Sequence, residues 1–107
     1  MATRSTLAEM EPREVVPGYR ARFIHTEHTT HAYWDIDPDL PLPEHSHPHE
    51  QIVNVLEGTI ELVVEGESHV LHAGDVLHIP GNVPHSAVAH TKCRVLDVFS
   101  PVREEYR

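Results

Sequence analysis

The stretch that decides the fold is LPEHSHPHEQ, residues 42–51, which is followed by a glycine at position 58. His45 and His47 stand two positions apart, and on an extended segment such side chains project from the same side. They can therefore reach one metal ion from adjacent positions, and histidine is the commonest metal ligand in proteins. A third donor after a short turn and a fourth from a distant strand would complete the protein's share of the ligands. The spacing thus indicates a metal site built on strands.

Short apolar runs broken by Gly, Pro and Asn surround this stretch, and none shows a helical stripe of useful length. Hairpin turns are expected at residues 56–59 and 65–68, and further turns at 73–75 and 80–84. Closely spaced strands with turn signals between them favour an antiparallel sandwich or barrel. The expected strands are residues 19–24, 30–36, 52–57, 59–65, 76–80 and 93–99.

Length and charge narrow the class of protein. A chain of 107 residues forms one small domain, and a net charge of −9 disfavours nucleic acid and anionic membranes as partners. No apolar run approaches the roughly 18–20 residues that span a bilayer, and the N-terminus lacks the apolar stretch of a signal peptide, so we expect a cytoplasmic protein. Residues 1–18 are expected to be an N-terminal extension that could be an edge strand swapped between subunits of a homodimer, and residues 19–107 to be the barrel.

Both halves of the sequence resemble the motifs of the cupin family. The first motif, G-x5-H-x-H-x3,4-E-x6-G, matches His45, His47 and Gly58, and the second, G-x5-P-x-G-x2-H-x3-N, matches Gly74, Pro80 and His85. The resemblance implies an all-β, single-domain cupin, which is a small double-stranded β-helix or jelly-roll barrel. It also implies one divalent transition metal ion, for which Ni, Fe, Mn, Zn and Co all fit a nitrogen-rich shell. The implied ligands are His45, His47, Gln51 and His85.

The departures from these motifs are informative. Asp39 and Asn82 stand where the motifs have glycine, Ala89 replaces the terminal Asn, and Gln51 occupies the place of the acidic ligand. Glu50 is an adjacent alternative, but counting from both ends of the first motif selects Gln51. A neutral amide leaves the full +2 charge on the ion. This favours Lewis-acid catalysis on an oxygen-rich substrate over redox chemistry with molecular oxygen. His49 is expected in a turn. Of the other histidines, His25, His28 and His31 are expected on a solvated face, and His69, His72, His78 and His90 on the surface or lining the barrel.

The C-terminal strand carries the second set of candidates. Alternation along residues 93–99 places Asp97 between Val95 and Phe99 on one face, where burial of a carboxylate without a partner is costly. Asp97 is either paired structurally or on an exposed face, or it is an acid/base beside the metal. Arg103 follows Pro101 and could hold a substrate carboxylate in a bidentate fork, although an isolated arginine is more often a surface residue.

HSHPHEQ, GDVLHIPGNVPH and DVFSPVREEY together resemble the KdgF-type pectin-degradation cupins from about residue 19 onward. This resemblance implies conversion of cyclic 4,5-unsaturated monouronates from pectin or alginate to linear keto-deoxyuronates. It assigns catalytic or substrate-binding roles to Asp97, Phe99 and Arg103, with an anionic sugar acid as the small-molecule partner. An Fe- or Ni-dependent dioxygenase and a non-catalytic cupin that binds a small ligand or metal are the alternatives.

Overall fold

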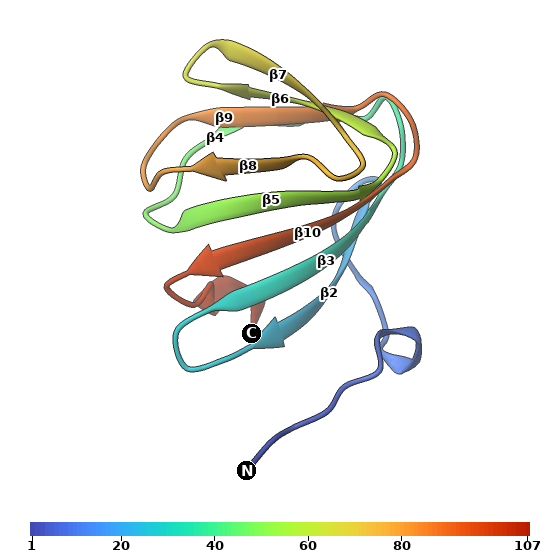
Figure 1. Cartoon of the computed structure of the whole chain (residues 1–107), viewed down its shortest axis with the longest axis vertical. Coiled ribbons are helices and arrows are strands. Elements are labelled where there is room, and N and C mark those ends of the chain that lie inside the picture. Colours follow the sequence, from blue (N-terminus) through green and yellow to red (C-terminus); the bar gives the residue numbers. More distant parts are fainter.

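Ten strands and two short 3-10 helices make up the computed structural model, which describes residues 1–107 (Figure 1). The strands form a six-stranded antiparallel sheet in the order β1-β2-β3-β10-β5-β8 and a four-stranded one in the order β4-β9-β6-β7. The helices are Leu7–Glu9 (η1) and Glu104–Tyr106 (η2). The strands are Arg13–Val16 (β1), Tyr19–His25 (β2), Thr30–Ile36 (β3), Leu42–His45 (β4), Glu50–Glu57 (β5), Thr59–Val64 (β6), Glu67–His72 (β7), Val76–Ile79 (β8), His85–Ala89 (β9) and Cys93–Ser100 (β10).

The all-β prediction is confirmed, and each of the six expected strands is present within two residues of its predicted ends. Four strands, β1, β4, β7 and β9, were not expected. Each has only four to six residues, so the hydrophobic alternation that reveals a strand is weak there. No helix of the structure combines the length and apolar character needed to cross a membrane.

Two glycine turns that look alike in the sequence have different outcomes. Glu65 and Gly66, with φ angles of 50° and 78°, form a two-residue hairpin that joins the paired strands β6 and β7, as predicted. The hairpin predicted at residues 56–59 is wrong, because β5 and β6 belong to different sheets and do not pair. Gly58, with a φ of 88°, instead turns the chain from one sheet into the other.

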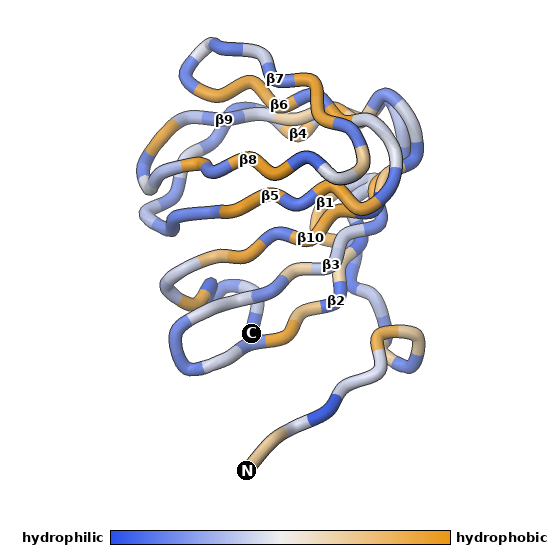
Figure 2. The backbone as a smooth tube through the Cα atoms, in the orientation of Figure 1, coloured by the Kyte–Doolittle hydropathy of each residue, from blue (hydrophilic) through white to orange (hydrophobic).

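The two sheets enclose the core between them. Buried and more exposed residues alternate along β3 and β10, and Figure 2 shows apolar and polar segments alternating along the strands. Strand β10 is hydrogen-bonded to β3 on one side and β5 on the other. Its inward-facing residues, Cys93, Val95, Asp97 and Phe99, are all buried, as the alternation predicts.

The two missing motif glycines are replaced by residues that adopt the same unusual backbone. Asp39 and Asn82 both have a φ of 66°, in the left-handed region where Asn and Asp are tolerated best after glycine. The Asn82 backbone N–H donates to the His47 carbonyl oxygen at 2.7 Å, and the Asp39 N–H to the Ala89 carbonyl oxygen at 2.9 Å. These substitutions therefore preserve the turns that the cupin motifs require.

The N-terminal residues contribute an edge strand. Strand β1 pairs antiparallel with β2 of the same chain, with Glu14 opposite Arg20. Arg20 also pairs with Asp37 at 2.9 Å, which ties the edge to the end of β3. Exchange of this strand within a homodimer stays a prediction.

Gly58→Ala is expected to destabilise the fold far more than Gly66→Ala. A Cβ at Gly58 would collide with the Lys92 carbonyl oxygen and lie 2.8 Å from Cys93 Sγ, whereas a Cβ at Gly66 meets nothing within 4 Å. Both changes carry the left-handed penalty of about 1–2 kcal/mol. Gly58→Ala adds an overpacking cost of about 1–3 kcal/mol. Urea unfolding measures the free energy of unfolding of both variants. An equal decrease in the two would contradict the steric clash inferred at Gly58.

Candidate functional site

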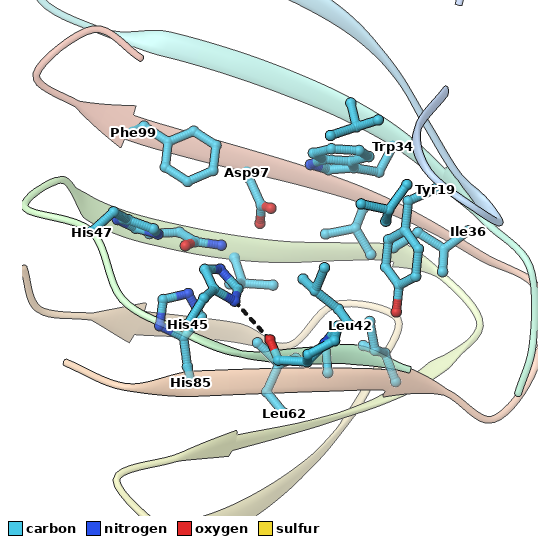
Figure 3. Close-up of a pocket in the computed structure, with 18 of the residues that line it drawn as sticks. Tyr19, Trp34, Ile36, Leu42, His45, His47, Leu62, His85, Asp97 and Phe99 are labelled. Carbon is cyan, nitrogen blue, oxygen red and sulfur yellow. Dashed lines mark hydrogen bonds between the residues drawn. The ribbon is translucent and has the colours of Figure 1, made fainter. Parts of the chain in front are cut away.

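A cavity of about 320 Å³ lies between the two sheets, and 13 of its 21 lining residues are hydrophobic. Its polar residues gather at one end, near Phe99, while Tyr19, Ile36 and Leu42 line the other (Figure 3). The polar lining contains the predicted site residues other than the aromatic Phe99, namely His45, His47, Gln51, His85, Asp97 and Arg103.

Three histidines converge at the polar end. His45 ends β4 and lies opposite His85, the first residue of β9, while His47 follows in the loop after β4. Their potential ligand atoms all lie within 4.8 Å of one another. Strand pairing thus brings together residues forty positions apart, as the cupin motifs imply.

Backbone carbonyl oxygens orient each of the three imidazoles. The Nδ1 atoms of His45, His47 and His85 lie 3.0, 3.0 and 2.8 Å from the carbonyl oxygens of Pro43, His49 and Val83. A carbonyl can only accept a hydrogen bond, so each Nδ1 carries the proton and each Nε2 keeps its lone pair. Such outer-shell partners are what hold ligating histidines in position in metal sites.

Gln51 adds an oxygen donor to the same cavity. It is buried on β5 opposite Phe99 of β10, and its Oε1 has no hydrogen-bond partner. Glu50, the alternative, is exposed and accepts a hydrogen bond from His78 at 2.8 Å on the outside of the sheet. The structure therefore places Gln51, and not Glu50, at the cavity.

The donor set fits a divalent transition metal ion. Nε2 of His47, Nε2 of His85 and Oε1 of Gln51 are buried without a partner, and a buried acceptor left unsatisfied costs about 1–3 kcal/mol. Three imidazole nitrogens completed by an amide oxygen suit the borderline metals of the first transition row. These residues could hold one ion, and no other group of three or more His, Cys, Asp or Glu side chains is arranged to do so.

Burial keeps the imidazoles in the form that binds metal. It lowers the pKa of His47 to about 4, with smaller contributions from the charges of Arg103 and His85. Burial likewise lowers the pKa of His85. Both side chains are therefore neutral at pH 7, so metal binding there does not have to displace their protons.

Asp97 lies within the cavity with its Oδ1 buried and unpartnered. Burial raises the pKa of this carboxyl to about 7, and the nearby Gln51 amide, Trp34 indole and Arg103 charge offset only part of that effect. Neither Gln51 nor Trp34 makes a hydrogen bond of normal geometry to it. A carboxyl group with such a pKa can both accept and donate a proton near neutral pH.

Arg103 lies at the same end of the cavity, held by the C-terminal segment. Its guanidinium stacks 4.7 Å from the Phe99 ring centre and 4.6 Å from that of Tyr106, while its Nε donates to the Glu105 carboxylate. Its backbone N–H donates to the Thr30 hydroxyl at 2.9 Å. The terminal guanidinium nitrogens make no hydrogen bond within the protein and can bind an anion.

Three residues near the cavity were not predicted. Trp34 and Tyr106 line it, and His25 anchors Tyr106 by donating from Nε2 to its carbonyl oxygen at 3.1 Å. Alternation along residues 30–36 could have placed Trp34 on the buried face, whereas no sequence pattern marks Tyr106. His25 was expected on a solvated face and is instead half-buried, with Nδ1 2.9 Å from the Thr30 hydroxyl.

The other histidines do not belong to the three-histidine group, although the His49 ring centre lies 5.5 Å from that of His47. His49 is half-buried outside this group, with an unpartnered Nδ1, and His28 and His72 are exposed. His90, also exposed, pairs with Glu61 at 3.0 Å on the outside of the four-stranded sheet.

Comparison with known proteins adds family evidence to this geometry. Residues 32–99 match the family model described as "Cupin domain". The chain is 39% identical over 64 residues to the pectin degradation protein KdgF of Dickeya dadantii, and 46% identical over 47 residues to quercetin 2,3-dioxygenase of Bacillus subtilis. These matches cover 58% and 44% of this chain, and they span only 58% and 14% of the respective relatives.

A solved structure, KdgF from Halomonas sp., superposes with a TM-score of 0.94 at 29% identity. That alignment covers 100% of both chains. The likeness therefore includes the N-terminal strand and the C-terminal segment that carries Arg103, which lie outside the family-model match.

His85→Ala is expected to lower metal affinity at least about 100-fold, more than the loss of an outer-shell partner usually costs. The reason is that it removes one of three converging nitrogen donors. His90→Ala is the matched control, because that imidazole is exposed and lies on the opposite side of the sheet. Calorimetric titration with Ni²⁺ or Zn²⁺ measures both, and equal affinities would place the metal elsewhere.

Proposed function

Because this chain belongs to the cupin domain family, and its likeness to two KdgF proteins supports a cupin of the KdgF type, we propose that it converts cyclic 4,5-unsaturated monouronates to linear keto-deoxyuronates. The observation that carries the proposal is the meeting of Asp97 and Arg103 with the three histidines in one cavity. An acid/base, an anion-binding group and a metal site are the three components that we assign to this reaction.

The proposed ligands of the ion are His45, His47, Gln51 and His85. When bound, a divalent transition metal ion supplies Lewis acidity toward substrate oxygen atoms. Gln51 contributes an amide where a carboxylate would add a negative charge, so the protein leaves the ion's charge uncompensated.

Arg103 binds the substrate carboxylate in this proposal. Its Nε is occupied by Glu105, and the two terminal nitrogens remain for a charge-assisted pair with the anion. Contacts with the faces of the Phe99 and Tyr106 rings restrain the guanidinium, so less side-chain freedom is lost on binding. Phe99 thereby forms one wall of the substrate site.

Asp97 moves the proton. In the cyclic substrate the ring oxygen joins the anomeric carbon to the C4–C5 alkene. Asp97 takes the proton of the anomeric hydroxyl, the bond between the anomeric carbon and the ring oxygen breaks, and an aldehyde and an enolate form. Asp97 then returns the proton to C4 as the enolate becomes a ketone. The reaction is an isomerisation, and no oxidant, reductant or water is consumed.

A second candidate is a cupin dioxygenase that acts on an aromatic substrate. Two observations favour it, the mainly hydrophobic lining of the cavity and the similarity to the Bacillus quercetin 2,3-dioxygenase. That similarity covers 44% of the chain.

The direct test is loss of alkene absorbance from a freshly generated 4,5-unsaturated monouronate, with metal-loaded protein. We expect decay faster than the uncatalysed background. Asp97→Asn should lower kcat at least about 100-fold, the lower range for loss of a general acid/base. Asp39→Asn is the control, because it removes an exposed carboxylate. A wild-type rate equal to background, with oxygen uptake on an aromatic substrate, would replace the isomerase with the dioxygenase.

Asp97→Asn is also expected to stabilise the metal-free protein at pH 8. Burial raises the pKa of Asp97 from 3.8 to about 7, so between these pH values the unfolded state ionises more readily and the native state loses stability. Above pH 7 the loss reaches as much as about 4 kcal/mol, at 1.36 kcal/mol per pKa unit. Urea unfolding should show this gain at pH 8 and not at pH 3.5. An equal effect at both pH values would contradict a buried carboxylate.

A further inference from the structure

The only tryptophan of the chain, Trp34, has a buried side chain whose polar atom is unsatisfied. It lies on β3 between Ala21 of β2 and Val95 of β10 and faces the interior, where it is 8% exposed. Trp34 is one of the residues that line the cavity, and its Nε1 has no hydrogen-bond partner. Buried tryptophan N–H groups usually find an acceptor, so this donor calls for an explanation.

Aromatic neighbours fix the orientation of the indole. Tyr19, Phe23 and Tyr106 contact it edge to face, with ring centres 6.3, 6.0 and 6.3 Å away. The nitrogen end of the ring is turned toward the carboxyl group of Asp97 (Figure 3). Trp34 Nε1 and Asp97 Oδ1 are both buried without a hydrogen-bond partner.

Packing alone does not account for a tryptophan at this position. Its surroundings are apolar and aromatic, and a phenylalanine would place a ring there without burying an unpaired donor. The indole N–H is instead held at the polar end of the cavity, beside the proposed acid/base.

We propose that Trp34 is a substrate-binding residue whose Nε1–H donates a hydrogen bond to an oxygen atom of the bound sugar acid, on the side of the ring next to Asp97. The inference rests on the proposed function, because it takes the ligand to be a hydroxylated monouronate. A site built to pair with a substrate oxygen discriminates against analogues that lack it. Trp34 would therefore favour oxygen-bearing rings over aromatic hydrocarbons of similar size in the same cavity.

The wild-type protein provides the first test, because one tryptophan gives one indole cross-peak in the ¹H–¹⁵N spectrum. The probe is galacturonate, a saturated monouronate without the reacting alkene, added to zinc-loaded protein. We expect a saturable shift of that cross-peak. Acetate, an anion without hydroxyl groups, should leave it in place at the same concentration.

Trp34→Phe keeps an aromatic ring and removes the donor. It should raise KM for the unsaturated monouronate about 5–10-fold with kcat changed less than about twofold, as expected for one hydrogen bond made equally in the ground and transition states. Tyr33→Phe is the matched control, because Tyr33 precedes Trp34 on β3, faces the opposite side of the sheet and does not line the cavity. This control should leave KM unchanged.

The outcomes separate this inference from the proposed reaction. Turnover by wild type with an unmoved indole cross-peak, or an unchanged KM in Trp34→Phe, overturns the Trp34 contact alone. A saturable indole shift without turnover supports the contact and overturns the reaction. Neither shift nor turnover overturns both. If Trp34→Phe fails to fold, the indole cross-peak of the wild-type protein still tests whether Trp34 contacts the ligand.

Discussion

The pairing of β10 with β3 on one side and β5 on the other is the constraint on which the rest of the site depends. Along β10, Asp97 lies opposite Ala32 and Val53, and Phe99 lies opposite Thr30 and Gln51. A slip of one residue in either pairing would turn Asp97 and Phe99 to the outer face and replace them with Leu96 and Val98. Side-chain alternation makes such a slip costly, because the inner face of β10 is buried along its whole length.

The second sheet contributes the histidines, so the site forms only where the two sheets meet. His45 and His85 face each other across β4 and β9, while Gln51 and Asp97 come from the larger sheet. The C-terminal segment then closes over this end, anchored by the Thr30 hydroxyl, which accepts from the Arg103 N–H and lies 2.9 Å from His25 Nδ1. The functional residues thus depend on long-range packing and not on any one local motif.

The sequence predicts those parts of the fold that follow from hydrophobic periodicity and motif spacing. The His-x-His pair, the distant His85 and the inward face of β10 are all where the patterns place them. Asp39 and Asn82 show why motif departures can be harmless, since a φ of 66° admits Asp and Asn as well as glycine. The hairpin predicted at Gly58 was wrong because a glycine in the sequence marks a turn without saying which sheet the next strand joins. The roles of Tyr106 and His25 could not be predicted from the sequence, since the contact between them joins residues about 80 positions apart.

The chemistry of the cavity argues for an oxygen-rich ligand despite the hydrophobic lining. Most of the apolar lining residues are core residues, and Ile36, Ile60, Leu62 and Val95 are each less than 5% exposed. With the imidazole nitrogens and the Gln51 oxygen assigned to the metal ion, the unpartnered polar groups that remain to select a ligand are the Asp97 carboxyl and the Trp34 indole. An aromatic hydrocarbon would leave these groups unpaired in a low-dielectric site, at a cost for each. The net charge of −9 repels an anion at long range, but Arg103 gives the cavity a local positive charge, and buried pairs are screened far less than surface ones. A small sugar acid satisfies both the polar groups and that charge, which an uncharged aromatic ring does not.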